Sequence, residues 1–369
     1  MRILTVVGNR PQLVKAAAVS PQLRKLAEEV LVHSGQHYDH ELSAVFFEEL
    51  GIPLPDHDLA VGSGSHARQT ATAISRLEPL LEQERPDAVL VYGDTNTTLA
   101  AALVAAKLPL PLVHVEAGMR SFDASMPEEV NRVVVDHVSG LLLCSTETAL
   151  ENLRAEGLAE RARIVGDVMA DVARRFGPIA EERSRIHDQL GLRRGEYLVA
   201  TLHRAASVDD GPSLRRAAEL LAAVAEQFGP LVFVVHPRTD GRLAEAGLMP
   251  TLEANSRIIV SKSLGYLDFT ALIRGSRAVL TDSGGLQKEA YLAGVPCVTL
   301  RPQTEWLETV DSGWNRLAGL DAEAALRDLG ELIARRREES PDPAIYGDGR
   351  AAERCARELV SWLEAATAP

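Results

Sequence analysis

The sequence has little of what several large classes of protein require. No segment approaches the ~20 consecutive apolar residues of a membrane-spanning helix, so we expect no membrane-embedded part. Cysteine is scarce: Cys144, Cys297 and Cys355 share no metal-ligand spacing and lie in or beside apolar stretches, which predicts reduced packing residues. The N-terminal "MRILTVVGNR" is a short apolar run leading straight into polar sequence, typical of a first buried strand rather than a signal peptide. We therefore expect a cytoplasmic protein.

Motifs for metals, dinucleotides and nucleic acids are also missing. The net charge of −13 argues against broad nucleic-acid binding, because that affinity depends on clustered Lys and Arg. The segment "HYDH" fits no familiar zinc spacing, and the sequence has no HExxH. "VVGNRPQLVK" lacks the G-x-G-x-x-G pattern that seats a dinucleotide pyrophosphate. We expect no metal and no NAD.

What the sequence does contain is a repeated alternation of strands and helices. Short β-branched runs alternate with Ala- and Leu-rich helical stretches, which predicts parallel sheets with crossover helices, and the alternation restarts after about residue 167. We predict an α/β fold of two doubly wound Rossmann-like domains facing a cleft, residues 1–166 and 167–349, with a last helix over 350–369. The predicted strands are 2–7, 29–33, 87–92, 111–115, 141–145, 196–202, 230–235, 256–261, 278–282 and 297–300.

The stretch "TDSGGLQKEAYLAGVP", residues 281–296, follows one of these strands. Gly284 and Gly285 remove the Cβ atoms that would keep a ligand off the backbone, and the next helix points unpaired N–H groups at the same spot. An anion would bind there. Glu289 lies further along the helix, where it could accept hydrogen bonds from hydroxyls of the same ligand, which suggests a nucleotide. An ordinary strand-to-helix turn explains the stretch equally well.

Basic residues open the first predicted helix. Ligands of doubly wound sheets bind beyond the carboxyl ends of the strands, and Arg10 and Lys15 follow the first strand directly. Cations at a helix N-terminus oppose the macrodipole, so an anionic partner is favoured over a solvated basic turn.

Three carboxylates follow other strands of the first half. Asp94 stands before threonines suited to a helix cap, so simple capping is one explanation for it. Nothing in the local pattern requires an acid at Glu116, whereas Glu128 and Glu129 lie in a first helical turn, where acids are favoured anyway. Together, facing one cleft, Asp94, Glu116 and Glu128 are suited to proton transfer at a single carbon.

The second half adds histidines and an aromatic residue. His203 and His236 each end a strand, where packing or capping explains either one alone. Opposite an anion site, however, His203 and Arg204 could neutralise and protonate a departing phosphate. Phe269 precedes Ser283 and could stack on a base, although on pattern alone a core aromatic explains it better.

Several motifs in this order resemble those of the non-hydrolysing UDP-N-acetylglucosamine 2-epimerases. They span nearly the whole chain: "GNRPQLVK", "GQHYD", "GDT", "HVEAGMRS", "PEEVNR", "HR", "HP" and "TDSGGLQKEA". The resemblance implies the glycosyltransferase-B architecture, a homodimer, a UDP-sugar substrate and a C-terminal helix that packs back on the first domain. It also implies that UDP is eliminated to give a 2-acetamidoglucal and then added back, without a cofactor.

The matching positions carry implied roles. The implied catalytic residues are Asp94, Glu116, Glu128 and His203, and the implied substrate-binding residues are Arg10, Lys15, Arg204, His236, Phe269 (uracil), Ser283, Gly284 and Gly285 (diphosphate) and Glu289 (ribose). Many bacterial members bind a second UDP-N-acetylglucosamine as an activator, and Gln36, Arg68 and Gln69 match that site. Asp39 stands where a glutamine is usual.

Besides Asp39, the chain departs from the family pattern at four positions. Gln12 replaces an acid, Ala206 and Ser207 replace the "EN" of "HRxEN", and Trp306 replaces an arginine. "RPQ" with "TEW" resembles the branch that epimerises UDP-2,3-diacetamido-2,3-dideoxy-glucuronate, which is the alternative to UDP-N-acetylglucosamine as substrate. Two further hypotheses are a glycosyltransferase of the same fold, which would need an acceptor site, and a non-catalytic nucleotide-sugar sensor.

Overall fold

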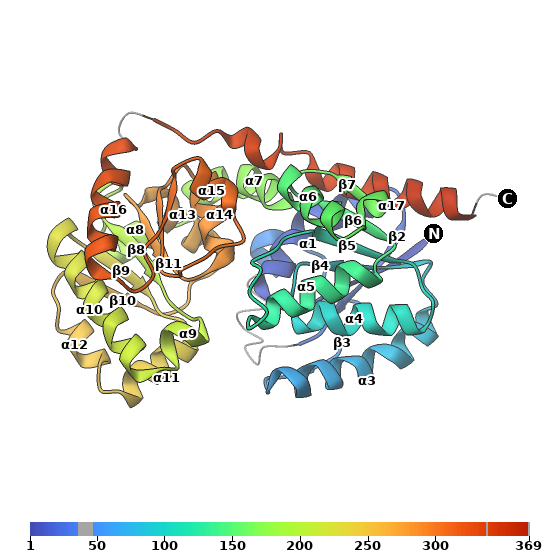
Figure 1. Cartoon of the computed structure of the whole chain (residues 1–369), viewed down its shortest axis with the longest axis horizontal. Helices are drawn as coiled ribbons and strands as arrows, with labels where there is room; N and C mark the ends of the chain where they lie inside the picture. Colours follow the sequence, from blue (N-terminus) through green and yellow to red (C-terminus); the bar gives the residue numbers. More distant parts are fainter. Residues whose placement is uncertain (36–46, 337–338, 368–369) are drawn as a thin grey trace. The chain divides into compact units, whose positions relative to one another are not determined.

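The computed structural model describes residues 1–35, 47–336 and 339–367, which form two compact units. Unit 1 comprises Met1–Arg174 and Pro343–Pro369, and unit 2 comprises Arg175–Asp342. The division falls inside helix α7 (Val168–Arg183), and the chain returns to unit 1 at the short 3-10 helix η2 (Pro343–Tyr346) (Figure 1).

Unit 1 is built on a seven-stranded sheet in the order β3-β2-β1-β4-β5-β6-β7, and all of its strand pairs are parallel. The strands are β1 (Arg2–Val7), β2 (Glu28–His33), β3 (His57–Asp58), β4 (Ala88–Tyr92), β5 (Leu112–Ala117), β6 (Leu141–Cys144) and β7 (Ala162–Ile164). Helices cover both faces, so central strands such as β4 are apolar and buried throughout. The strand order reverses between β1 and β4, where sheets of this type bind ligands.

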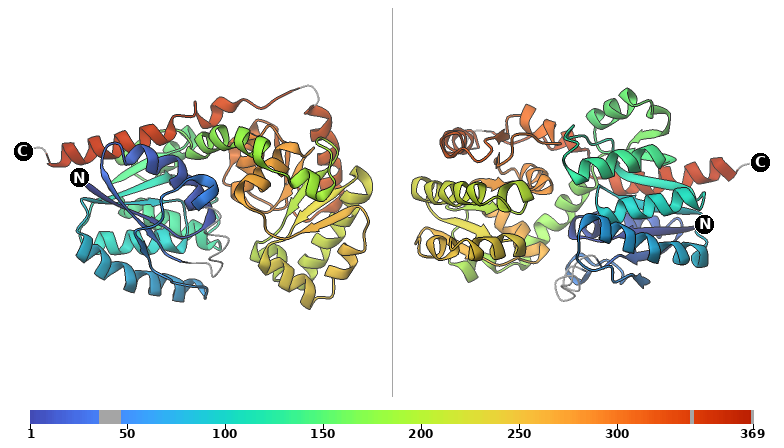
Figure 2. Two further views of the ribbon diagram at one scale, coloured as in Figure 1. Left: turned by 180° about the vertical axis from the view of Figure 1, so that it is seen from behind. Right: turned by 60° about the horizontal axis from the view of Figure 1, so that its bottom comes forward.

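The helices of unit 1 lie in two layers. They are α1 (Arg10–Leu23), α3 (His66–Glu84), α4 (Asn96–Lys107), α5 (Pro127–Val138), α6 (Glu147–Ala155), the 3-10 helix η1 (Ala159–Arg161), the first part of α7 and α17 (Ala351–Thr367). The α3 and α4 helices pack together on one face of the sheet, and α17 packs against α1 and β6 on the other (Figures 1 and 2). Asp171 of α7 caps α17 by accepting from the backbone N–H groups of Ala351 and Ala352 at 3.1 and 2.8 Å.

Unit 2 repeats the arrangement with six parallel strands in the order β10-β9-β8-β11-β12-β13. The strands are β8 (Leu198–Thr201), β9 (Leu231–Val234), β10 (Ile258–Ser261), β11 (Val279–Thr281), β12 (Cys297–Thr299) and β13 (Asn315–Leu317). The helices are α8 (Ile186–Leu190), α9 (Ala205–Val208), α10 (Gly211–Phe228), α11 (Pro237–Glu245), α12 (Met249–Glu253), α13 (Tyr266–Gly275), α14 (Gly284–Leu292), α15 (Leu307–Asp311) and α16 (Ala322–Arg335). The order reverses between β8 and β11.

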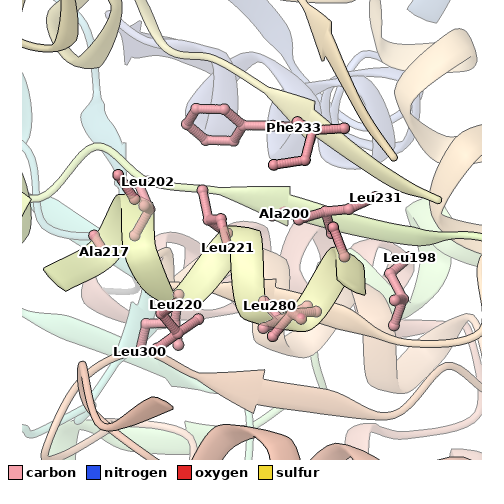
Figure 3. Packing of buried hydrophobic residues seen from close by; sticks show 14 of the residues in the cluster. Leu198, Ala200, Leu202, Ala217, Leu220, Leu221, Leu231, Phe233, Leu280 and Leu300 are labelled. Carbon is pink, nitrogen blue, oxygen red and sulfur yellow. The ribbon is translucent and has the colours of Figure 1, made fainter. Parts of the chain in front are cut away.

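The core of unit 2 shows why its sequence folds in this way. Helix α10 places apolar side chains at i, i+3, i+4 and i+7 spacing, so that one stripe faces the sheet. Leu220 and Leu221 of this helix belong to the same buried cluster as Leu198 of β8 and Phe233 of β9 (Figure 3). The helix begins at Gly211, where the Asp210 side chain caps it by accepting from the N–H of Ser213.

The predicted pair of doubly wound parallel sheets is confirmed, and all ten predicted strands are present. Three strands were missed: β3, β7 and β13, which have the sequences "HD", "ARI" and "NRL". Each lies at the edge of its sheet, where it pairs on one side only. Edge strands are short and half-exposed, so they lack the apolar run by which a central strand is recognised.

No helix in the described part of the chain is long and apolar enough to cross a membrane. The three cysteines are buried and free, as predicted for packing residues. Burial raises the pKa of Cys144 and of Cys297 to about 12, so these thiols stay protonated and unreactive at neutral pH.

Candidate functional site

The start of α1 is fastened to the end of β4 by Gln12. Its side-chain oxygen accepts from the N–H of Gly8 at 2.7 Å, and its amide nitrogen donates to the Tyr92 carbonyl at 2.9 Å and to Thr98 Oγ1 at 2.8 Å. Gln12 is buried. The replacement of the family's acid by this amide therefore affects the hydrogen bonds that connect α1 to β4. Arg10, the first residue of α1, is half-buried.

Lys15 pairs with Glu116 in unit 1. The Nζ and Oε1 atoms are 2.5 Å apart, and both side chains are more than nine-tenths buried. The anionic partner expected for this cation is therefore a carboxylate of the same chain. Lys15 lies on α1 after β1, and Glu116 lies on β5, so the pair spans the position where the strand order reverses.

Glu116 has an unusual backbone. It was expected just after a strand, but it lies inside β5, where its φ is +68° and the register with β6 shifts between Val115 and Ala117. A non-glycine residue in the left-handed region costs about 1–3 kcal/mol and persists only where the surroundings impose it. The bulge turns the Glu116 side chain out of the alternation of the strand, and the Lys15 ammonium holds it there.

Asp94 does not cap α4. Thr95 is the N-cap, and it forms a capping box with Thr98. Asp94 instead pairs through its carboxylate with Arg132, while Asn131 donates to its backbone carbonyl at 2.9 Å. The capping explanation for Asp94 was wrong, because a threonine one residue later takes that role.

The two acids at the start of α5 have different surroundings. Glu129 is buried and accepts from the N–H and Oγ of Ser121, both at 2.8 Å, and from the N–H of Phe122 at 3.1 Å. It therefore shapes the loop before α5. Glu128 is half-buried and shares the face of α5 that carries Arg132, by the i, i+4 spacing. Arg132 was not predicted as a site residue, because an arginine inside a helix gives no local signal.

In unit 2, a histidine and an aspartate join the ends of β8 and β11. His203 Nδ1 lies 3.1 Å from Asp282 Oδ1, and Asp282 also accepts from the N–H groups of His203 and Arg204, at 3.0 and 2.9 Å. Burial acts to raise the pKa of Asp282, but the hydrogen bond and charge of His203 and the backbone N–H groups outweigh it and hold the pKa below its usual range. Asp282 was not predicted, although it stands inside the "TDSGG" stretch.

His236 lies beside His203 and caps a helix. The ring centroids are 5.6 Å apart, and His236 Nδ1 accepts from the N–H of Arg238 at 3.2 Å as the N-cap of α11. The capping explanation therefore holds for His236, with Nε2 left to carry the ring proton. The His203 Nδ1 atom faces Asp282, so its Nε2 atom is the one directed away from that carboxylate.

The start of α14 has two glycines in different settings. Ser283 is the N-cap and makes no side-chain capping bond. A Cβ atom on Gly284 would meet Glu305 Oε1 at 2.2 Å, whereas one on Gly285 would meet nothing within 4 Å. A side chain at Gly284 would therefore force the Glu305 carboxylate to move, whereas the space at Gly285 is open. Further along the same helix, Glu289 is half-buried.

The loop after β12 packs on this helix. Arg301 Nη2 and Glu305 Oε2 are 3.0 Å apart, and the Lys288 ammonium lies 3.8 Å from the centre of the Trp306 ring. All four side chains are buried. A tryptophan in place of the family's arginine thus stacks on a buried cation of α14. Phe269, on α13, is half-buried and so is not a full core aromatic.

The residues matching the activator site lie at the start of α3. Gln69 accepts from Asn96 at 3.0 Å, and Arg68 is exposed. Gln36 and Asp39 lie outside the described residues. Among the residues with described positions, no group of three or more His, Cys, Asp or Glu side chains could hold a metal ion.

Comparisons with known proteins agree on one family. The family model described as UDP-N-acetylglucosamine 2-epimerase matches residues 22–360. A Methanococcus maripaludis protein described as a UDP-N-acetylglucosamine 2-epimerase homolog is 44% identical over 333 residues, 90% of this chain and 92% of that protein. The UDP-2,3-diacetamido-2,3-dideoxy-D-glucuronate 2-epimerase of Pseudomonas aeruginosa is 42% identical over 369 residues, 98% of this chain and 99% of that protein.

A solved structure extends the likeness to three dimensions. The crystal structure of Methanocaldococcus jannaschii UDP-GlcNAc 2-epimerase in complex with UDP-GlcNAc and UDP has a TM-score of 0.93 and 38% identity, and the match covers 98% of this chain and 100% of that one. The class is that of nucleotide-sugar 2-epimerases, isomerases with a glycosyltransferase-B-like fold, which confirms the predicted architecture. The chain belongs to the UDP-N-acetylglucosamine 2-epimerase family.

Proposed function

We propose that the chain catalyses the reversible C2 epimerisation of UDP-N-acetylglucosamine to UDP-N-acetylmannosamine. The observation that carries the proposal is the paired set of acids and cations at the ends of β4 and β5, Asp94 with Arg132 and Glu116 with Lys15. Acids held in this way are suited to a proton transfer at carbon. The likeness to the Methanocaldococcus jannaschii enzyme supports the choice of sugar.

The chemistry explains why a nucleotide-binding part and a proton-transferring part are both needed. The C2 proton of an N-acetylhexosamine is not acidic, because no carbonyl group is attached to C2. As the C1–O bond breaks, its electron pair leaves with UDP, and the positive charge developing at C1 acidifies the C2 proton. A carboxylate removes that proton to give a 2-acetamidoglucal, and UDP then adds back while a proton is delivered to the opposite face. The reaction needs no cofactor.

The groups of unit 1 act on the sugar in this proposal. Asp94, Glu116 and Glu128 accept and return the C2 proton. Lys15 and Arg132 hold two of these carboxylates in place and balance their charge. Arg10, at the start of α1, contacts the substrate as a further cation. The strained backbone at Glu116 is consistent with this role, because residues in rare conformations cluster at functional sites.

The groups of unit 2 hold UDP. The N–H groups after Ser283 bind the diphosphate at the start of α14, where Gly285 leaves the backbone open to it. His203, oriented by Asp282, turns Nε2 to the leaving diphosphate, with Arg204 and His236 beside it. Glu289 binds the ribose and Phe269 packs against the uracil.

A deuterium experiment tests the reaction. The enzyme is incubated with UDP-N-acetylglucosamine alone in deuterated water and followed by proton NMR. We expect UDP-N-acetylmannosamine carrying deuterium at C2, with no added NAD, metal or acceptor. Protium retained at C2 of the epimerised product would contradict the elimination route, and an absolute requirement for an acceptor would favour the glycosyltransferase hypothesis.

A second substrate has its own support. The 42%-identical relative from Pseudomonas aeruginosa acts on UDP-2,3-diacetamido-2,3-dideoxy-D-glucuronate by its name. Gln12, which replaces the family's acid, does not decide between the two sugars, because its amide is hydrogen-bonded to Tyr92 and Thr98 within unit 1. Measuring kcat/KM for both UDP-sugars decides between them, and a tenfold preference for the uronate would overturn our choice.

A further inference from the structure

A buried histidine lies behind the carboxylates of unit 1. His114, on β5, is fully buried. Its Nδ1 atom is 2.7 Å from Asp136 Oδ1, and its Nε2 atom is 2.7 Å from the carbonyl oxygen of Gly93. Both neighbours are hydrogen-bond acceptors, whereas a neutral imidazole can donate from only one nitrogen. Both contacts are satisfied together by a ring that carries a proton on each nitrogen, an imidazolium.

The charge on this ring is balanced locally. Asp136, which is also fully buried, accepts from Arg120 Nη1 at 2.7 Å and from the N–H of Gly118 at 3.1 Å. Arg120 in turn makes two bonds of 2.7 Å to Glu156. Burial acts to raise the pKa of Asp136, but His114 and Arg120 outweigh it and lower the pKa. Two cations thus face two anions, as a buried charge network requires.

The network joins the three segments that carry the proposed proton-transferring acids. Gly93 directly precedes Asp94, and His114 stands two residues before Glu116 on β5. Asp136 lies on the face of α5 that carries Glu128, two turns further along the helix. His114 is thus bonded directly to the end of β4 and to α5 while belonging to β5.

We propose that His114 is a positioning residue for the epimerisation, setting the place of Glu128 on α5 relative to Asp94 and Glu116. The proposal rests on the proposed function. His114 does not act on the substrate itself, because it is buried and both of its nitrogens are bonded within unit 1. Its effect on catalysis passes through the acids that its neighbours carry.

Asp136→Asn keeps the size of the side chain but removes the negative charge that holds α5 to His114 and Arg120. The amide oxygen can still accept from Arg120 and Gly118, but the amide nitrogen then faces His114 Nδ1 as a donor. His114 would become neutral, with one proton on Nε2 for Gly93. We expect kcat to fall by roughly 10–100-fold, because misplacing a catalytic group by about 1 Å has effects of this size. KM and the Kd of UDP should stay within about twofold.

His114→Gln is the second variant, and His187→Gln is its matched control. His187 in unit 2 is half-buried and bonds to the Tyr197 hydroxyl at 2.9 Å, so its replacement also removes an internal histidine contact. We expect His114→Gln to lose kcat as Asp136→Asn does and His187→Gln to keep it. If kcat fell equally in all three variants, general destabilisation would explain the losses and the proposal would be wrong.

A double-mutant cycle with Glu128→Gln separates positioning from stability. If Asp136→Asn acts through Glu128, it should lower kcat by less than about threefold in the Glu128→Gln background. If the fold-loss of kcat in the double variant equalled the product of the two single losses, the proposal would be wrong. If the wild type does not epimerise, the proposed function fails. If it epimerises and both network variants match it, only the positioning role fails.

A spectroscopic readout does not depend on activity. In protein labelled with ¹⁵N at histidine, His114 should show a directly bonded proton on both ring nitrogens, with the signal assigned by its loss in His114→Gln. Asp136→Asn should leave a proton on one nitrogen only. A wild-type His114 ring with a single protonated nitrogen would contradict the imidazolium and with it the proposal.

Discussion

The two units share one topology but present different chemistry at the place where the strand order reverses. In unit 1 the side chains pair with one another, acid with cation, as in Lys15 with Glu116 and Arg132 with Asp94. In unit 2 a helix start presents backbone N–H groups, and one histidine is oriented by a buried aspartate. Moving a proton at carbon needs charged side chains held at fixed places, whereas a diphosphate is held by many backbone donors. The same fold thus supplies both kinds of site that the proposed function requires.

The two units also differ in the backbone conformation of their candidate residues. In unit 1 a glutamate occupies the left-handed region at φ +68°, where a glycine would be relaxed. The strained conformation is therefore explained by the need for the glutamate side chain at this position. In unit 2 the absence of a side chain matters, since Gly284 is packed under Glu305 and Gly285 leaves open space. Changes in unit 1 should therefore affect turnover, and changes in unit 2 should affect UDP binding.

The largest effect is expected from Glu116→Gln and Glu128→Gln. Each should lower kcat by roughly 10²–10⁴-fold, the usual contribution of a general acid or base, and leave the Kd of UDP within about twofold. Steady-state kinetics and calorimetric titration of UDP measure the two quantities. Glu151→Gln, on the exposed side of α6, is the control and should match the wild type. A matching loss of UDP affinity would erase the distinction between the units.

Glu289→Ala should show the opposite pattern. Losing a hydrogen bond from a charged group to the ribose should weaken UDP binding by roughly 10–100-fold, with kcat at saturating substrate lowered much less. The control is Glu219→Ala on the exposed side of α10, which should leave both values unchanged. Turnover lost without any loss of UDP affinity would move Glu289 to the group of acids that act on the sugar.

The neighbouring glycines of α14 give the sharpest test inside unit 2. Gly285→Ala should weaken UDP binding by about tenfold while the free energy of unfolding stays equal or rises by up to about 1 kcal/mol, because alanine favours helix. Gly284→Ala should lower the free energy of unfolding by about 1–3 kcal/mol, because the new methyl group overlaps Glu305. Denaturant unfolding and UDP titration of both variants check this. Equal UDP affinity in Gly285→Ala and wild type would show that the diphosphate does not bind at this helix start.

The smallest effect concerns acid stability and Asp282. Its pKa in the folded protein is below the unfolded value of about 3.9, so its contribution to stability is present above pH 4 and is lost as the pH falls through the folded value. Asp282→Asn should be less stable than the wild type at pH 7, and the difference should narrow below about pH 4. Urea unfolding between pH 3 and pH 7 measures it. A difference independent of pH would show that the carboxylate charge contributes nothing.

Local patterns in the sequence predicted most of the fold and the position of most candidate residues. Apolar runs marked every central strand, and candidate residues such as Arg10, Asp94, His203 and Ser283 follow the strands between which the order reverses. The sequence did not predict the role of a residue when that role depends on a partner distant in the chain. Arg132 and Asp282 were missed on this account, and capping stayed open as one explanation for Asp94 because the neighbouring threonines gave no sign of which residue would cap.

By itself, the sequence determined the alternation of strands and helices, the two parallel sheets and the glycines at the start of α14, because these depend on side chains a few residues apart. Only the tertiary structure decided which charges meet. Lys15 and Glu116 are 101 residues apart in the chain, and Arg132 and Asp94 are 38 apart. Such pairs form only after crossover helices have brought separate strand ends together, and the bulge at Glu116 arises only from pairing with β6. Charge pairing across strands is a property of the folded sheet.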